Sequence, residues 1–230
     1  MNLILGIVEL VVCFSGILVC DKLFGKRGLF AWMAIAVVFA NIQVSKQIDI
    51  LGISTSLGNV VFASTYLTTD ILNEKYGDKA SKNAVKISAG ALIAYIVFAQ
   101  ITQNYIPNST DMVDSGMKII FSMAFRITLA SGCMFLLSNW LDVAIYQKIK
   151  EKTDGKYMWL RNNLSTLVCN CGENFAFTFL AFLGTFDFLY CVEIALTASL
   201  VEMIIAFCDT PFLYISKRIG KTGILIAEEE

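Results

Sequence analysis

Apolar residues occur in this chain in seven long blocks that are separated by short polar stretches. A helix needs about 20 apolar residues to cross the hydrocarbon core of a bilayer, and each block comes close to that length. A soluble domain would need more polar surface than a chain that is 57% hydrophobic and only 16% charged supplies. The blocks are Leu3–Cys20, Leu29–Ser45, Ile50–Leu72, Ala84–Ile101, Ile119–Tyr146, Leu164–Phe182 and Tyr190–Tyr214. The sequence therefore predicts an all-α, polytopic membrane helix bundle.

Two blocks depart from the form of a simple membrane-spanning helix. Residues 50–72 are the least hydrophobic, so this segment is either a regular helix or a re-entrant or irregular element. The fifth block is too long for the hydrocarbon core. We expect its first part, Lys118–Phe125, to run along or beyond the outer membrane interface.

The positive charges predict the orientation of the chain. Of the 18 Lys and Arg residues, 15 fall within residues 22–27, 75–86, 148–161 and 217–221. Short loops that carry Lys and Arg stay on the cytoplasmic side, and all four places share one side if every block crosses. We therefore expect seven crossings, with the N-terminus outside and the C-terminus in the cytoplasm. Because the connections are short, residues 1–230 are predicted to form a single transmembrane domain.

The sixth block carries a stripe of polar side chains into the membrane. A charge at the centre of a membrane helix costs about 2.5–3.5 kcal/mol, so Glu173 must face a partner or water. Asn170 lies three residues earlier, on the same helical face. With Asn163 and Thr166 the stripe is longer than one structural hydrogen bond requires. We favour a binding or transport role over helix–helix adhesion, which is the alternative for polar residues in a membrane.

Polar and charged residues enter the other blocks as well. They are Asn41, Gln43, Asp70, Arg126, Asp142, Glu202 and Asp209. Arg126 and Asp142 are too far apart on one helix to pair, so each is expected to have a partner elsewhere. For Asp209, which precedes Thr210 and Pro211, helix capping and a gating salt bridge both remain open.

Several kinds of protein are excluded or disfavoured. The chain has no histidine, P-loop, G-x-S-x-G or C-x-x-C motif, so we expect no cofactor, no metal and no enzymatic activity. The lysines do not cluster with aromatic residues, which disfavours nucleic-acid binding. Asp70 and Glu74 share a helical face at a spacing that resembles a metal-bound catalytic pair. The simpler interpretation is a helix end that pairs with Lys75 or Lys79.

Several segments together resemble the queuosine precursor transporter family, also known as the vitamin uptake transporter family. These are FANIQ, STYLTTDILNEKYGDKA, FRITLAS, LDVAIYQKIK, WLRNNLSTLVCNCGENFAFTFLAF and DTPFLYISKRI, which lie between about Asn41 and Ile219. The resemblance implies a bacterial inner-membrane carrier of 7-deazaguanine bases: 7-cyano- or 7-aminomethyl-7-deazaguanine, or queuine. It also implies a core of six helices. Residues 28–220 would then be the transporter core, and residues 1–27 an additional N-terminal helix.

The chemistry of such a base fits the polar residues. A carboxylate can accept two neighbouring N–H groups of a guanine-like edge, and flat rings stack on aromatic side chains. We predict Glu173 as the main acceptor, with Asn170 beside it. The predicted substrate-binding set is Glu173, Asn170, Asn41, Gln43, Asp70, Arg126, Phe62, Tyr66, Asn163 and Glu202. Gating or structural charges are predicted at Asp142, Asp209 and Arg161.

The chain departs from the family pattern at two of these positions. Family members usually carry Asp where this chain has Glu173, and often a basic residue where it has Glu202, so the preferred base stays open. Two other functions remain as alternatives: a membrane subunit of an ATP-driven importer, and an intramembrane metal-dependent enzyme that uses Asp70 and Glu74. The driving force is open as well, and a homo-oligomer is compatible with the sequence.

Overall fold

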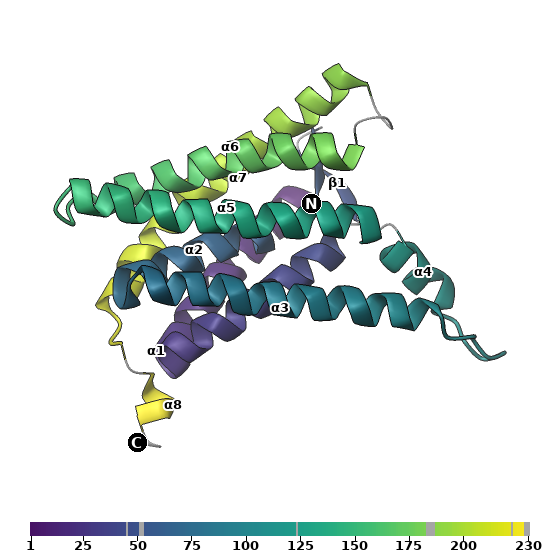
Figure 1. Ribbon diagram of the computed structural model, residues 1–230, viewed down its shortest axis with the longest axis horizontal. Coiled ribbons are helices and arrows are strands. Elements are labelled where there is room, and N and C mark those ends of the chain that lie inside the picture. Colours follow the sequence, from purple (N-terminus) through teal and green to yellow (C-terminus); the bar gives the residue numbers. More distant parts are fainter. Residues whose placement is uncertain (45, 51–52, 123, 183–186, 222, 228–230) are drawn as a thin grey trace.

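The computed structural model describes residues 1–44, 46–50, 53–122, 124–182, 187–221 and 223–227. Within these residues the protein is helical except for one two-stranded hairpin (Figure 1). The elements are α1 (Asn2–Gln43), β1 (Gln47–Ile50), β2 (Ile53–Ser56), α2 (Asn59–Tyr76), α3 (Asp78–Gln103), α4 (Asp114–Ser122), α5 (Ala124–Lys152), α6 (Met158–Phe182), α7 (Phe188–Arg218) and α8 (Ile224–Ala227). The predicted all-α class is confirmed.

Helix α1 consists of two arms that fold back on each other at a kink. Gly25 lies in the kink with a φ of 55°, a conformation that glycine adopts without steric cost. The ring of Trp32 in the second arm lies against Gly16 in the first, where an added Cβ would be 2.6 Å from it. Farther along, Gln43 donates a hydrogen bond of 2.7 Å to Glu9. The two arms of α1 correspond to the first two apolar blocks.

The third apolar block is not one helix. It begins in an antiparallel hairpin, in which Gln47 pairs with Ser56 and Ile50 with Ile53, and becomes helical only at Asn59. Residues 53–56 have the sequence ISTS, and Ser, Thr and β-branched residues favour strands and turns over helix. This answers the question left open for residues 50–72. The remaining helix, α2, is buried along most of its length and contacts α1, α3, α5 and α7.

The fifth apolar block also divides. The short helix α4 ends at Ser122 and α5 starts at Ala124, so residues 118–125 belong to two helices. An ion pair of 2.7 Å between Lys118 and Asp114 lies within α4. In Figure 1, α4 lies beyond the end of α3. Helix α5 then packs on α6, and it also contacts α3 and α2, whereas α6 contacts α7.

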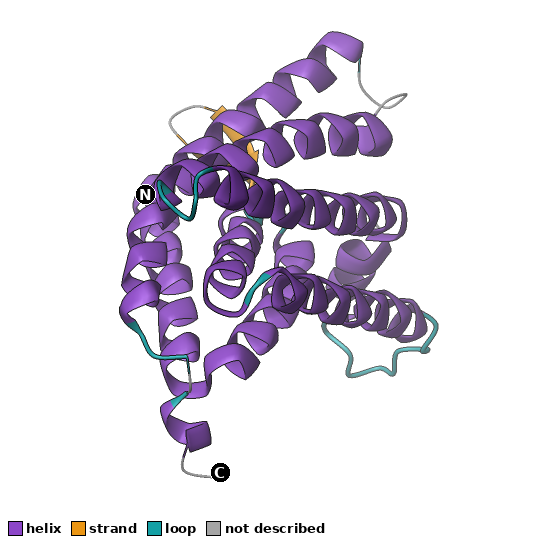
Figure 2. Cartoon of the chain, turned by 60° about the vertical axis from the view of Figure 1, so that its left-hand side comes forward, coloured by secondary structure: helices purple, strands orange, loops and turns teal. Residues whose placement is uncertain are grey.

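The distribution of side chains is that of a membrane protein. Among the described residues, three helices are long and apolar enough to cross a bilayer by length and composition, namely α1, α3 and α7. Large apolar side chains such as Ile35, Phe98 and Ile204 are exposed on the outside, whereas Asp70 and Asp142 are fully buried. Such an arrangement, with the charged groups inside and the apolar groups outside, is the one that lipid requires, because lipid cannot solvate a charge. Figure 2 shows the helices gathered into one bundle, with the hairpin at one of its ends.

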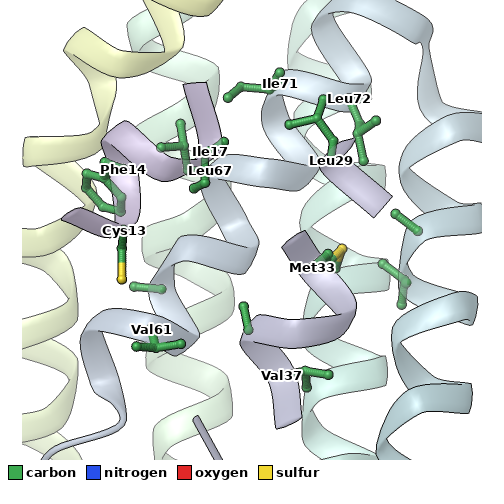
Figure 3. Close-up of a cluster of buried hydrophobic side chains, with 14 of the residues drawn as sticks. Cys13, Phe14, Ile17, Leu29, Met33, Val37, Val61, Leu67, Ile71 and Leu72 are labelled. Carbon is green, nitrogen blue, oxygen red and sulfur yellow. The ribbon is translucent and has the colours of Figure 1, made fainter. Parts of the chain in front are cut away.

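The apolar core lies where α1 packs on α2. Ile17 and Leu67 meet there, and Leu29 lies beside Leu72 (Figure 3). One ion pair is buried at its edge: Lys75 of α2 lies 2.7 Å from Asp21 of α1. These two residues have further partners, since Ser216 of α7 donates to Asp21 at 2.7 Å and Lys75 donates to the Gly220 carbonyl at 3.1 Å. The first arm of α1 is therefore joined to α2 and α7 by charge as well as by packing.

Candidate functional site

A small pocket with both polar and apolar lining residues lies where α1, α2, α5, α6 and α7 meet, next to the ends of the hairpin. Its volume is about 70 Å³. The lining residues are Ala40, Asn41, Val44, Gly58, Asn59, Phe62, Ser131, Glu173, Asn174, Phe177 and Glu202. Four residues predicted from the sequence to bind substrate thus line one cavity, although they come from four different helices: Asn41, Phe62, Glu173 and Glu202.

Glu173 is held in place by a chain of hydroxyl groups. The Tyr66 hydroxyl donates a hydrogen bond to the Oε2 atom of Glu173. Ser138 of α5 lies 2.5 Å from the same hydroxyl and supplies the second hydrogen bond. Tyr66 is fully buried, so this chain has no water to compete with it. The carboxylate of α6 is therefore oriented by side chains of α2 and α5 and stays directed at the pocket.

A second carboxylate enters the pocket from α7. Glu202 is 5% exposed, and its Oε2 atom accepts a hydrogen bond of 2.7 Å from Asn174. Asn41 adds a third acceptor, since its amide group donates to the Val37 carbonyl at 2.8 Å while its Oδ1 atom is buried without a partner among the described residues. A buried acceptor without a donor is unfavourable unless a ligand or water supplies one. The polar lining is therefore suited to a ligand that is rich in N–H donors.

Aromatic rings form the flat part of the lining. Phe62 of α2 and Phe177 of α6 both border the pocket. Phe62 is fixed by edge contacts with Tyr66 and Phe135, at centroid distances of 5.9 and 6.1 Å. Phe175, in contrast, stacks on Phe179 at 6.5 Å and does not line the pocket. A planar ring that enters the cavity meets the rings of Phe62 and Phe177 beside the carboxylates.

One helical turn from this layer lies a group of buried carboxylates. Asp70 follows Tyr66 by four residues on α2, and Asp142 follows Ser138 by four on α5, so both lie on the faces that orient Glu173. Thr166 of α6 lies 3.5 Å from Asp142. The polar path thus continues from the pocket between α2, α5 and α6 toward the other end of the bundle.

Parts of this layer have no hydrogen-bond partner. Both oxygens of Asp70 and both amide atoms of Asn170 are buried without a partner among the described residues. Asp209, by comparison, accepts a hydrogen bond of 2.7 Å from Asn162, which ties α7 to α6. Buried polar groups in proteins are almost always satisfied. Asp70 and Asn170 therefore have hydrogen-bonding capacity available for a proton, water or substrate.

The path ends in a cluster of charges around Glu74. Three cations from three helices contact this carboxylate: Lys150 at 3.2 Å, Arg161 at 2.6 Å and Lys217 at 3.1 Å. Arg161 also donates to the carbonyls of Gly155 and Lys156 at 3.0 Å. We call Glu74 and these three cations the Glu74 cluster. Because Glu74 already has three cationic partners, it is not available as the second ligand of an Asp70–Glu74 metal pair.

Most of the chain matches a known protein family. Residues 56–216 match a family model described as "Putative vitamin uptake transporter". The chain belongs to this family. It is accordingly a membrane transporter, and the matched region includes α2, α5, α6 and α7, which form most of the pocket.

Two curated members of the family are similar over most of the chain. A protein of Bacillus subtilis (strain 168), named "Probable queuosine precursor transporter", is 32% identical over 209 residues, which is 90% of this chain and 91% of that protein. A protein of Escherichia coli (strain K12), named "Queuosine precursor transporter", is 25% identical over 163 residues, or 68% of this chain and 69% of that protein. No solved structure matches the chain.

The other predicted binding residues lie outside the pocket lining of this transporter. Gln43 pairs with Glu9, and Asn163 donates to Thr210 at 2.8 Å. Asp70 and Asn170 belong to the carboxylate layer, and Tyr66 orients Glu173 from behind. Arg126 was predicted to have a partner outside its own helix. Its side chain lies outside the part of the chain that the structure describes.

The predicted set lacks several residues of the site, among them Asn59 and Ser138. Asn59 lines the pocket, and Ser138 completes the hydroxyl chain to Glu173. A signal for Asn59 was present, because it precedes Phe62 by three residues on the same helical face. Ser138 had no such signal, since its role depends on how α5 packs against α2.

Proposed function

We propose that this transporter imports queuosine precursors, which are 7-deazaguanine bases. The observation that carries the proposal is the pocket of acceptors beside aromatic rings: Glu173, Glu202 and the free Oδ1 atom of Asn41, with Phe62 and Phe177 next to them. A guanine-like edge offers adjacent N–H donors that a carboxylate accepts side by side. The names of the two curated relatives support the same substrate class.

The proposed orientation has the N-terminus outside and the C-terminus in the cytoplasm of a bacterial inner membrane. Lys150, Arg161 and Lys217 belong to two of the basic places expected on the cytoplasmic side, and they meet at Glu74. Lys75, from a third, pairs with Asp21 directly before the fourth. This gathering of basic residues supports a single domain that crosses the membrane several times. In the proposed division, residues 28–220 form the core and residues 1–27 the additional helix.

The pocket as it stands is smaller than a substrate site. Its volume of about 70 Å³ is well below the ~300 Å³ at which ligand sites begin. The pocket must therefore widen to admit a base, and the Glu74 cluster must separate to release it on the cytoplasmic side. A carrier that alternates between two such states needs a bistable contact at each end. The Glu74 cluster supplies that contact at the cytoplasmic end.

Uptake measurements test the proposal through Glu173. Cells that lack their own transporter receive the wild-type protein, Glu173→Ala or the control Glu193→Ala, and uptake of radiolabelled base is measured with guanine and adenine as competitors. We expect uptake by the wild type and the control, and loss of uptake with Glu173→Ala at equal membrane abundance. Undiminished uptake by Glu173→Ala contradicts the role of the pocket. Uptake by the purified protein in liposomes without ATP distinguishes a stand-alone carrier from a subunit of an ATP-driven importer.

A further inference from the structure

We propose that the pocket selects a base that carries a positively charged substituent, with Glu202 as its counter-charge. The inference rests on the proposed function and names the preferred member of the substrate class. Among the bases that the family resemblance implies, those with an amine at position 7 are cations at neutral pH, whereas 7-cyano-7-deazaguanine is neutral.

The described lining of the pocket carries negative charge without a balancing cation. Two of the lining residues, Glu173 and Glu202, are acids, and no described residue of the lining is a lysine or an arginine. Buried carboxylates need a cation or a proton, because the apolar surroundings do not solvate the negative charge. A cationic ligand brings the missing positive charge with it.

Glu173 and Glu202 have different partners and therefore suit different parts of the ligand. Glu173 is fixed from behind by Tyr66 and faces the rings of α2 and α6, which suits the N–H edge of the base. Glu202 comes from α7, on another side of the cavity. Its Oε2 atom accepts a hydrogen bond of 2.7 Å from Asn174. The protein thus positions the Glu202 carboxylate at the same cavity that Glu173 lines.

An aminomethyl group and a cyano group differ in whether they donate hydrogen bonds. When it is ionised, the Glu202 carboxylate only accepts hydrogen bonds, so it pairs with an ammonium group. A nitrile also only accepts and would face an ionised carboxylate unfavourably. The pocket therefore stabilises an aminomethyl group and disfavours a cyano group.

Competition among three bases tests the inference in proteoliposomes. Uptake of labelled base is measured against 7-aminomethyl-, 7-hydroxymethyl- and 7-cyano-7-deazaguanine. The hydroxymethyl base matches the aminomethyl base in size and lacks its charge. We expect the amine to compete about tenfold better than the alcohol, which is the scale of one charged hydrogen bond. Glu202→Gln should abolish this ratio, and Glu202→Asp should retain most of it.

Glu193→Gln is the matched control. Glu193 is exposed on the same helix, nine residues from Glu202 and so on the opposite face. It should keep the wild-type ratio. Equal competition by the amine and the alcohol in the wild type overturns the inference, even if no Glu202 variant folds. An unchanged ratio in Glu202→Gln overturns the role of Glu202. Absence of any uptake by the wild type contradicts the proposed function instead, so the two failures are distinguishable.

Discussion

The Tyr66 hydroxyl donates a hydrogen bond to Glu173, although 107 residues separate the two in the chain. This contact joins α2 to α6 and directs the carboxylate at the pocket. Glu173 is therefore an oriented acceptor rather than a charge that happens to be buried. It is also a contact that single substitutions can probe without altering the shape of either helix.

Tyr66→Phe should lower uptake by about tenfold or more while the protein remains folded. The substitution removes the donor to a buried carboxylate, a hydrogen bond of the charged type whose loss costs about 1.5–3 kcal/mol. Initial uptake rates at equal membrane abundance measure the effect. Tyr214→Phe on the exposed face of α7 is the control and should match the wild type. Equal rates for both variants would show that the hydroxyl does not position Glu173.

Arg161→Gln and Lys217→Gln should differ strongly, although both residues contact Glu74. The Arg161 side chain is 0% exposed and the Lys217 side chain 53% exposed. Removing one partner of a buried ion pair costs about 3–5 kcal/mol, whereas an exposed pair contributes about 0–1 kcal/mol. Thermal unfolding of the purified variants in detergent compares them. Similar midpoints would contradict the burial-based ranking of the Glu74 cluster.

Gly25→Ala should destabilise the protein, whereas Gly90→Ala should not. Gly25 has a φ of 55°, and a Cβ there would lie 2.9 Å from the Gly223 nitrogen and the Lys221 carbonyl oxygen. With a ψ of −136° the backbone lies in a region that residues with a side chain rarely adopt, and the conformational cost alone is about 1–3 kcal/mol. A Cβ at Gly90 meets nothing within 4 Å, and alanine is favoured over glycine in a helix by about 1 kcal/mol. Unfolding midpoints in detergent test this; a stable Gly25→Ala would mean that the kink tolerates a side chain.

Asp21 and Lys75 should show strong coupling in a double-mutant cycle. Asp21→Asn leaves the buried ammonium of Lys75 without its carboxylate, which costs about 3–5 kcal/mol. Adding Lys75→Met removes the unpaired charge and should recover a large part of that loss. Unfolding of the two single variants and the double variant provides the measurement. Additive losses would indicate that the ion pair of 2.7 Å contributes little by itself.

Much of the fold follows from the positions of the apolar blocks. The two arms of α1, as well as α3, α6 and α7, lie where a continuous apolar run predicts a membrane helix. The hairpin before α2 was only partly predicted, because hydrophobicity alone does not distinguish a strand from a helix. The division of the fifth block into α4 and α5 was not predicted, because hydrophobicity does not show where one helix ends and the next begins. The preference of Ser, Thr and β-branched residues for extended structure decided the first case.

The candidate site was predicted by a different argument, the cost of charge in lipid. That cost identified Glu173 and Glu202 as residues that face inward, and the structure brings both to one pocket. The cost of charge in lipid did not predict which side chains contact Glu173 and Glu202. The partners of Glu173 and Glu74 lie on helices far away in the chain, and one sequence contains no record of helix packing.

The pairing of Asp21 with Lys75 also affects how the N-terminal arm can be removed. The family model begins at residue 56, which leaves that arm outside the matched region. Yet deletion of residues 1–27 would remove Asp21 and leave the buried ammonium of Lys75 without its carboxylate partner. A shortened version can tolerate the loss only when an uncharged residue replaces Lys75, so natural relatives without the arm should carry one there.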